Sequence, residues 1–192
     1  MNLSQRLKIL TDSKRTVFTT KDLRELWQET PRNTVVTAKR MVKKGLILKL
    51  TKGYYALNKE YNIYELANLI VSPSYISFNS ALFYWNICFQ ISDTINSIAL
   101  FNYQKKIEDK VYKYFAMKKE LFFNLEGIGV KENISIASPE RAILDSFYFG
   151  FLVNIDNPDK LNSTFFKKIS FFYPKSVQKT AIDFIKKYGS EI

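Results

Sequence analysis

The sequence lacks most of the residues on which catalytic and metal sites depend. It has no histidine and a single cysteine, Cys88, among 192 residues. Without histidine there can be no His-dependent triad, no histidine metal site and no usual general base near neutral pH. One cysteine builds neither an intrachain disulfide nor a thiolate metal site, and its neighbours Ile87 and Phe89 predict a buried core thiol.

Other absences narrow the class of protein further. No apolar run approaches the roughly 18 residues of a membrane span, and the first ten residues, MNLSQRLKIL, lack the apolar centre of a signal peptide. No Gly-rich phosphate loop of the P-loop or dinucleotide type occurs. Together these absences predict a cytoplasmic protein that is not an enzyme, with no cofactor, no metal and no membrane partner.

What is present is a substantial core and an uneven charge. The chain is 46% hydrophobic and 16% aromatic, which excludes a disordered protein. Its formal net charge is +11. Residues 1–60 hold 14 Lys and Arg against 5 Asp and Glu, a net of +9. Residues 61–192 hold 15 against 13, a net of +2. Basic charge concentrated in one third of a chain indicates a nucleic-acid partner.

The stretch Pro31–Gly45 carries much of that charge on an expected helix. Pro31 suits the first helical turn, and Gly45 suits the left-handed residue beyond its end. At 100° per residue, the polar side chains of Asn33, Thr37, Arg40 and Lys44 should lie within roughly 60° of one another. Val35, Ala38 and Val42 should lie on the opposite, packed side, and they are too small to anchor a helix in a membrane surface.

The neighbouring segments complete a recognisable order. Leu3, Leu7 and Leu10 predict a first helix, and Thr19-x-x-Asp22 resembles a capping box that opens a second. After the helix that begins at Pro31, residues 46–57 read as a hairpin with Gly53 in its turn. Three helices and a basic hairpin predict a winged helix-turn-helix DNA-binding domain over residues 1–60. Its predicted DNA contacts are Arg32, Asn33, Thr34, Thr37, Arg40, Lys44, Lys49 and Lys52.

Residues 61–192 predict a second, α+β domain after a short joint without Gly, Pro or Ser. Helices are expected from Ile63, after Ser77 and after Ser138-Pro139, with two more near residues 158–168 and 174–188. Between Thr94 and Ala137, β-branched and aromatic runs predict a small, mostly antiparallel sheet. Ser72-Pro73-Ser74 reads as a break between helices. The fold class is therefore α+β, a winged helix-turn-helix followed by a small sheet packed with helices.

Several residues of this second part need a choice between a site and a structural role. Glu140 and Asp145 are five residues apart on an expected helix and point about 140° apart, so capping and solvated-surface roles are preferred to an acid pair. The aromatic clusters Phe122-Phe123, Phe165-Phe166 and Phe171-Phe172-Tyr173 could stack bases. Their surroundings carry little net charge, which favours a packed core or a protein-binding surface.

Two segments of the second part carry a family resemblance. SPSYISFNSALFY (72–84) is similar to the PSYIS-x-x-SAL-x-Y signature of AbiEi-type antitoxins, and IASPERAILD (136–145) resembles the IA-[ST]-PE-[KR]-A-x-LD segment of that family. Where family members usually have a glycine, this chain has Asn86, which can adopt the same left-handed backbone. With the N-terminal domain included, the resemblance touches residues 1–150.

The resemblance implies a protein with two tasks. Such antitoxins are autorepressors whose N-terminal winged helix binds inverted repeats in double-stranded DNA of their own promoter. Their second domain counters a cognate nucleotidyltransferase-like toxin of a phage-defence system. Direct contact with the toxin, the neutralising residues and a homodimer on DNA are left open. The alternatives are a stand-alone winged-helix regulator whose second domain binds a ligand or dimerises, and an enzyme of unrecognised type.

Overall fold

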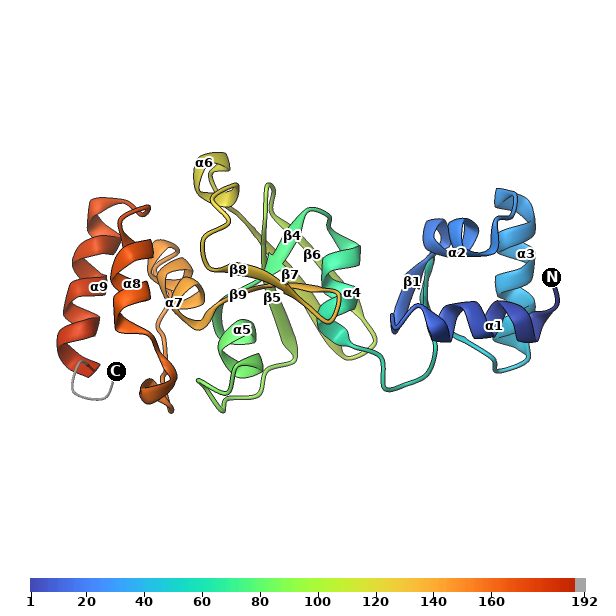
Figure 1. Ribbon diagram of the computed structural model, residues 1–192, viewed down its shortest axis with the longest axis horizontal. Helices are drawn as coiled ribbons and strands as arrows, with labels where there is room; N and C mark the ends of the chain where they lie inside the picture. The colour runs from blue at the N-terminus through green and yellow to red at the C-terminus, as the bar shows by residue number, and fades with distance from the viewer. Residues whose placement is uncertain (189–192) are drawn as a thin grey trace. The chain divides into compact units, whose positions relative to one another are not determined.

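The computed structural model describes residues 1–188 and divides the chain into two compact units (Figure 1). The N-terminal unit is Met1–Ile70 and the C-terminal unit is Val71–Ile192. The sequence placed the boundary after residue 60, ten residues too early. The difference arises because Thr16 donates hydrogen bonds from its backbone N–H and its hydroxyl to the buried Glu65 carboxylate, at 2.9 and 2.6 Å. Asn62 donates its backbone N–H to the Thr16 hydroxyl at 2.9 Å.

The N-terminal unit contains three helices, a three-stranded antiparallel sheet and a final short helix. The strand order is β1-β3-β2. Its elements are α1 (Leu3–Asp12), β1 (Val17–Thr19), α2 (Thr20–Trp27), α3 (Pro31–Lys43), β2 (Leu48–Thr51), β3 (Tyr54–Ala56) and α4 (Ile63–Ile70). The expected helices and hairpin are present. β1 was missed, because three residues after a turn carry no periodic pattern, and it pairs with β3 as the third strand.

Local signals explain where these helices begin and end. The Thr19–Asp22 capping box opens α2, and Thr30 caps α3 with Pro31 at its first position. Gly45 has φ of +67°, the left-handed conformation predicted for it. The helices meet in one hydrophobic core whose buried members come from all three helices and the sheet. These are Leu10, Phe18, Leu23, Trp27, Ala38, Met41, Ile47 and Tyr55.

The C-terminal unit is built on a six-stranded mixed sheet of order β6-β7-β5-β4-β9-β8. The β4–β5, β6–β7 and β8–β9 pairs are antiparallel, and the β4–β9 and β5–β7 pairs are parallel. The strands are β4 (Ser74–Ile76), β5 (Thr94–Ala99), β6 (Tyr103–Ile107), β7 (Lys110–Ala116), β8 (Ile128–Lys131) and β9 (Ile134–Ala137). The α+β class is thus confirmed, but the sheet is mixed rather than mostly antiparallel.

Two parallel pairs account for the difference: β5 pairs with β7 because β6 lies on the outer side of β7, and β9 pairs with β4, which the sequence assigned to a break between helices. This strand lies in the middle of the sheet and joins its two halves: Tyr75 pairs with Ile98 of β5, and Ile76 pairs with Ile136 of β9. All three of its residues are buried. A three-residue strand buried on both faces shows no alternation of polar and apolar residues, so periodicity could not detect it.

Helices pack against this sheet and against one another. They are α5 (Phe78–Tyr84), α6 (Lys119–Phe122), α7 (Pro139–Tyr148), α8 (Ser163–Ser170) and α9 (Lys175–Tyr188), with a 3₁₀ turn at Pro158–Lys160. α7 contacts α5, β9, α8 and α9, and Figure 1 shows it between the sheet and the α8–α9 pair. α7 is the central helix of this unit, since seven consecutive residues, Glu140–Ser146, are buried. Among residues 1–188, no helix combines the length and apolar composition that crossing a membrane requires.

Candidate functional site

The exposed face of α3 is the first candidate site. Of the six predicted contacts near this helix, Arg32, Asn33, Arg40 and Lys44 are exposed. Thr34 and Thr37 are 0% and 8% exposed and belong to the interior. The predicted packed side is wrong in part as well. Ala38 is buried, but Val35 is 37% exposed.

The buried threonines rotate the exposed face from the position that the sequence indicated. The Thr34 hydroxyl donates to the Thr30 carbonyl at 3.0 Å, and the Thr37 hydroxyl donates to a Glu29 carboxylate oxygen at 3.3 Å. Because both hydroxyls have partners, their burial has little desolvation cost. The exposed face is therefore turned by roughly 80°, toward Arg32, Val36, Lys39 and Lys43.

Lys39 and Lys43 are site candidates that the sequence interpretation missed. Their spacing from Arg32, seven and then four residues, places all three on one helix face. That pattern was available in the sequence, but the threonines were counted as polar surface and drew the predicted face away. Val36, 41% exposed, lies among these cations. An aliphatic side chain in a basic face can contact a thymine methyl group.

The cations of α3 and of the β2–β3 hairpin have no acidic partners in the described structure. The ion pairs of the N-terminal unit are formed by Arg6, Arg15 and Lys21. None of the cations on α3 or the hairpin forms an ion pair with a described residue. These are Arg32, Lys39, Arg40, Lys43, Lys44, Lys49 and Lys52. Their charge is therefore available to a phosphate backbone.

Glu29, in the α2–α3 turn, fixes how this face is presented. Its carboxylate accepts a hydrogen bond from Arg6 Nε of α1 at 2.9 Å and forms an ion pair with the same guanidinium. The other carboxylate oxygen accepts the Thr37 hydroxyl of α3. One side chain thus connects all three helices, so the exposed face of α3 is held on a rigid support.

The β2–β3 hairpin is similarly attached to the helices. Lys49 and Lys52 are both exposed, as predicted for a hairpin that contacts a phosphate backbone. Gly53, beside Lys52 in the turn, has φ of +86°, a conformation that glycine adopts without strain. Its carbonyl accepts the backbone N–H of Thr20 at 2.9 Å. The turn therefore lies against the first residue of α2.

The C-terminal unit contains a second candidate, a buried cluster around Asp145. The carboxylate of Asp145 accepts hydrogen bonds from the Tyr173, Ser77 and Tyr75 hydroxyls at 2.6, 2.7 and 3.2 Å. Arg141 Nε lies 3.3 Å from the same carboxylate. All five side chains are 2% exposed or less. Four of them come from the two segments that carry the family resemblance.

Arg141 connects this cluster to α6 and to the loop that follows it. Its guanidinium donates to the Leu121 carbonyl at 2.8 Å and to the Asn124 and Glu126 carbonyls at 3.2 Å each. Gly127, the next residue of the loop, has φ of +77°, and a Cβ there would lie 2.9 Å from the Arg141 Cβ. Only glycine allows the loop to approach the arginine this closely.

Burial dominates the protonation equilibria in the cluster. Burial raises the pKa of Asp145 against the opposing effects of Arg141 and the three hydroxyl donors. Burial and the adjacent carboxylate raise the pKa values of Tyr75 and Tyr173 well above their ordinary value. For Arg141, burial alone would lower the pKa, but Asp145, Tyr173 and Tyr75 together raise it. No member reaches solvent, so the cluster acts as an internal support.

The cluster corrects two interpretations of the sequence. Asp145 and Glu140 are not on a solvated surface: they are 0% and 5% exposed. The Glu140 carboxylate accepts the backbone N–H of Asn162 at 2.9 Å, so it holds the start of α8. Ser77 precedes α5 but makes no side-chain cap, because its hydroxyl is turned to Asp145. Ser138 does cap α7, and Asn86 has φ of +55°, both as predicted.

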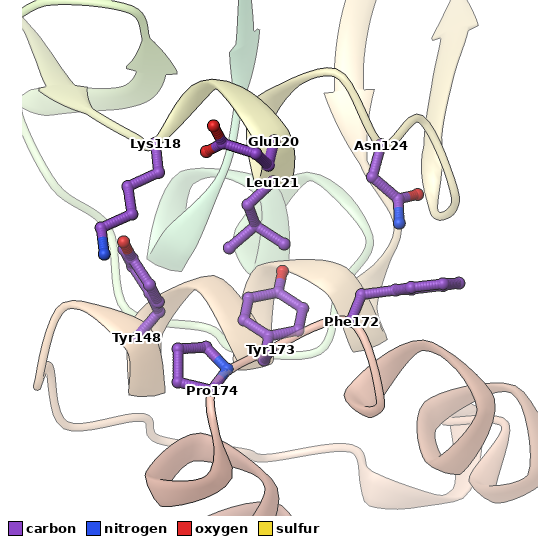
Figure 2. Close-up of a pocket in the computed structure, with 8 residues that line it drawn as sticks. All are labelled: Lys118, Glu120, Leu121, Asn124, Tyr148, Phe172, Tyr173 and Pro174. Atoms are coloured by element: carbon purple, nitrogen blue, oxygen red, sulfur yellow. The ribbon is translucent and has the colours of Figure 1, made fainter.

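A pocket of about 430 Å³ opens beside this cluster, between α6, the end of α7 and the α8–α9 connection (Figure 2). Tyr173 contributes to both, since it lines the pocket while its hydroxyl bonds Asp145. In Figure 2 the Tyr173 ring points toward α6, whereas the Phe172 ring extends sideways, away from Tyr173. The other lining residues are Lys118, Glu120, Leu121, Asn124, Tyr148 and Pro174.

Comparisons with known proteins identify no relative from which a function could be assigned. No protein-family model and no curated protein matches the chain. Within the described residues, no three His, Cys, Asp or Glu side chains gather where they could hold a metal ion. Cys88 is buried, as its apolar neighbours predicted.

Proposed function

We propose that this protein is a DNA-binding autorepressor and the antitoxin of a toxin–antitoxin pair, related to AbiEi-type antitoxins. Its N-terminal unit acts as a winged helix-turn-helix, and its C-terminal unit counters a nucleotidyltransferase-like toxin. The observation that carries the DNA-binding part is the exposed face of α3, where Arg32, Lys39 and Lys43 lie together without acidic partners.

The arrangement of the N-terminal unit supports this proposal. Three helices and a hairpin follow one another in the order of a winged helix-turn-helix, and the third helix presents cations and one exposed valine. The hairpin adds Lys49 and Lys52 as phosphate contacts. The protein would act without catalysing a reaction or binding a metal, and its DNA partner would be the inverted repeats of its own promoter.

The antitoxin part rests on the two resembling segments. They come together in the fold, since β4 pairs with β9, α5 contacts α7, and Tyr75 and Ser77 bond Asp145 across 70 and 68 residues of sequence. The Trp85 indole N–H also donates to the Ala137 carbonyl at 2.8 Å. Segments that form one buried structure support a shared family origin more strongly than two isolated matches would.

Duplex binding tests the DNA-binding part. If each protomer neutralises about 4–6 phosphates, log K against log salt concentration should have a slope of roughly −4 to −5. The ligand is the DNA upstream of the gene, measured by fluorescence anisotropy beside a scrambled duplex. Salt-independent affinity, or equal affinity for both duplexes, would contradict an autorepressor.

Co-expression tests the antitoxin part. The product of the adjacent reading frame should arrest growth alone and be harmless when this protein is present. Charge reversal at Lys39 and Lys43 should strongly weaken operator binding and leave this protection intact, because both side chains are exposed on α3. If the folded double variant no longer protects at matched expression, DNA binding is itself part of neutralisation.

The pocket beside Tyr173 favours one alternative function, a regulator whose second unit binds a ligand. A regulator of this kind would bind its operator normally but fail to protect against the adjacent gene product. The two measurements above therefore separate it from an antitoxin.

A further inference from the structure

A second hollow in the C-terminal unit lies between α8 and α9 and encloses about 460 Å³. Aliphatic and aromatic side chains form most of it, and lysines stand at its edges. Two of the apolar residues are strongly exposed, Phe171 at 73% and Ile182 at 54%. The lining residues are Lys167, Ser170, Phe171, Gln178, Ala181, Ile182, Ile185 and Lys186. This set is called the α8–α9 groove below.

The helices that form the groove carry most of the positive charge of their unit. Residues 158–188 contain seven lysines and two aspartates, a net of +5. Residues 71–157 contain eight Lys and Arg against nine Asp and Glu, a net of −1. The near-neutral sum for the whole second part conceals this separation.

The lysines alternate with the exposed apolar residues along each helix. On α9, Lys179 precedes Ile182 by three residues and Lys186 follows it by four, so all three share one face. At the end of α8, Lys167 precedes Phe171 by four residues. An apolar strip is thus bordered by cations on both helices. One of them, Lys186, also lies 3.9 Å from the Asp183 carboxylate, an exposed pair whose side chains are 75% and 64% exposed, so the attraction is weak and an incoming carboxylate can compete with it.

The floor of the groove offers almost no hydrogen-bonding group. The Gln178 side-chain amide donates to the Tyr173 carbonyl at 2.8 Å and to the Phe171 carbonyl at 3.4 Å, so its N–H groups are occupied within the protein. Ser170 donates its hydroxyl to the Lys167 carbonyl at 2.7 Å. The groove is suited to apolar side chains rather than to base edges, and only Phe171 is placed for stacking.

We propose that the α8–α9 groove binds an acidic amphipathic helix of a protein partner. The apolar side chains of that helix enter between Phe171, Ile182 and Ile185, and its carboxylates face Lys167, Lys179 and Lys186. The 14 residues of α9 correspond to about 21 Å, the length of a helix of about four turns. Identification of this partner as the toxin rests on the proposed function. The inference that the groove binds an acidic helix does not depend on it.

A designed peptide tests the groove itself. The probe is a helical peptide of about 14 residues with leucine at positions i, i+3, i+4 and i+7 and glutamate on the flanks. It should bind the full chain with an affinity that falls as salt rises, while the same peptide with lysine for glutamate should not bind. Equal binding of both peptides, or stronger binding of single-stranded oligonucleotide than of the acidic peptide, overturns the proposal.

Charge-reversed variants locate the binding. The double variant Lys179→Glu with Lys186→Glu changes two exposed side chains and should lower the affinity for the acidic peptide about tenfold. The lysine peptide should now bind this variant. Lys106→Glu with Lys119→Glu makes the same change of charge elsewhere in the unit and should have no effect. Equal losses in both double variants would mean that net charge, not the groove, binds the peptide.

The adjacent gene product then tests whether the partner is the toxin. If wild-type protein protects cells and Ile182→Glu does not, with the variant folded, the groove contacts the toxin. Protection retained by both Ile182→Glu and the Lys179/Lys186 variant overturns that identification. If wild-type protein itself gives no protection, the antitoxin function fails, and the peptide measurement still decides the groove.

Discussion

The two units use charged side chains in opposite ways. In the N-terminal unit, cations gather on an exposed helix face and lack acidic partners, while a few ion pairs such as Arg6–Glu29 hold the helices below. In the C-terminal unit, the single arginine in the sequence, Arg141, is completely buried and donates hydrogen bonds to groups of its own unit. The comparison teaches that a cation is available for binding when it lies on the surface with no internal partner or only an exposed one, and is structural when it is buried against a partner.

The largest expected effect is on unfolding free energy and compares one arginine substitution in each unit. Arg141→Met removes the cation beside buried Asp145 and leaves three carbonyls without their donor, which should cost about 3–5 kcal/mol of unfolding free energy. Arg6→Met breaks an ion pair with more access to water, whose side chains are 14% and 12% exposed, and should cost about 1–2 kcal/mol.

Urea titration can follow each unit separately, because each contains one tryptophan, Trp27 and Trp85. Each is observed alone in a background with the other replaced by phenylalanine. Similar losses of unfolding free energy in Arg141→Met and Arg6→Met would mean that the buried cluster contributes no more stability than the partly exposed ion pair between helices.

The second prediction concerns the rotated face of α3. Lys39→Glu with Lys43→Glu should lower operator affinity about 10–100-fold at moderate salt, because two phosphate attractions become repulsions. Unfolding free energy should hardly change, since both side chains are exposed. The Lys106/Lys119 double variant is the matched control in the other unit. If it reduces operator affinity equally, the DNA contact is not confined to the N-terminal unit.

A smaller effect concerns the start of α2. Asp22 accepts the Thr19 N–H and hydroxyl and the Arg15 guanidinium, so Asp22→Asn should cost about 1–2 kcal/mol. Burial alone would raise the pKa of Asp22, but these hydrogen bonds and the Arg15 charge lower it.

This contribution is therefore present above the unfolded pKa of about 3.9 and is lost as pH falls through the lower pKa of the folded state. The stability difference between wild type and Asp22→Asn should narrow below about pH 4 in urea titrations. A difference that stays constant to lower pH would mean that Asp22 does not stabilise as a carboxylate.

The smallest effect tests the correction to α3. Thr37→Val removes one hydrogen bond to Glu29 while keeping the shape of the side chain, and should cost about 0.5–1 kcal/mol. Operator affinity and sequence preference should be unchanged, because Thr37 is interior. A loss of preference at one base pair would restore the original interpretation that Thr37 contacts DNA.

The sequence predicted the N-terminal unit well where its signals are local. The Thr19–Asp22 capping box, Pro31 and Gly45 each determine the backbone within a few residues, and each was found as expected. The face of α3 was misplaced because threonine has a methyl and a hydroxyl and can be buried once the hydroxyl is bonded. For Thr37 the partner is Glu29, which a helical projection of α3 does not include, and for Thr34 it is the Thr30 carbonyl.

The C-terminal unit was predicted less well because its determining contacts are distant in sequence. The Asp145 carboxylate is bonded by Tyr75, Ser77 and Tyr173, which are 70, 68 and 28 residues away. No periodic pattern contains such information. The resembling segments contain four of the five residues of the cluster, although the solvated-surface role predicted for Asp145 was wrong.

The composition of the Asp145 cluster has a consequence for synthesis on the ribosome. The long-range hydrogen bonds described above for the N-terminal unit, such as Thr16–Glu65 and Arg6–Glu29, join residues within Met1–Ile70, so these contacts can form while the rest is still being translated. The C-terminal unit cannot complete its cluster until Tyr173 has emerged, a hundred residues after that unit begins. During that interval Asp145 lacks the Tyr173 hydroxyl as a donor, and α7 lacks its contacts with α8 and α9. A nascent chain that stalls before Tyr173 would thus present a finished DNA-binding unit joined to an unfinished partner, and be open to proteases in its second half alone.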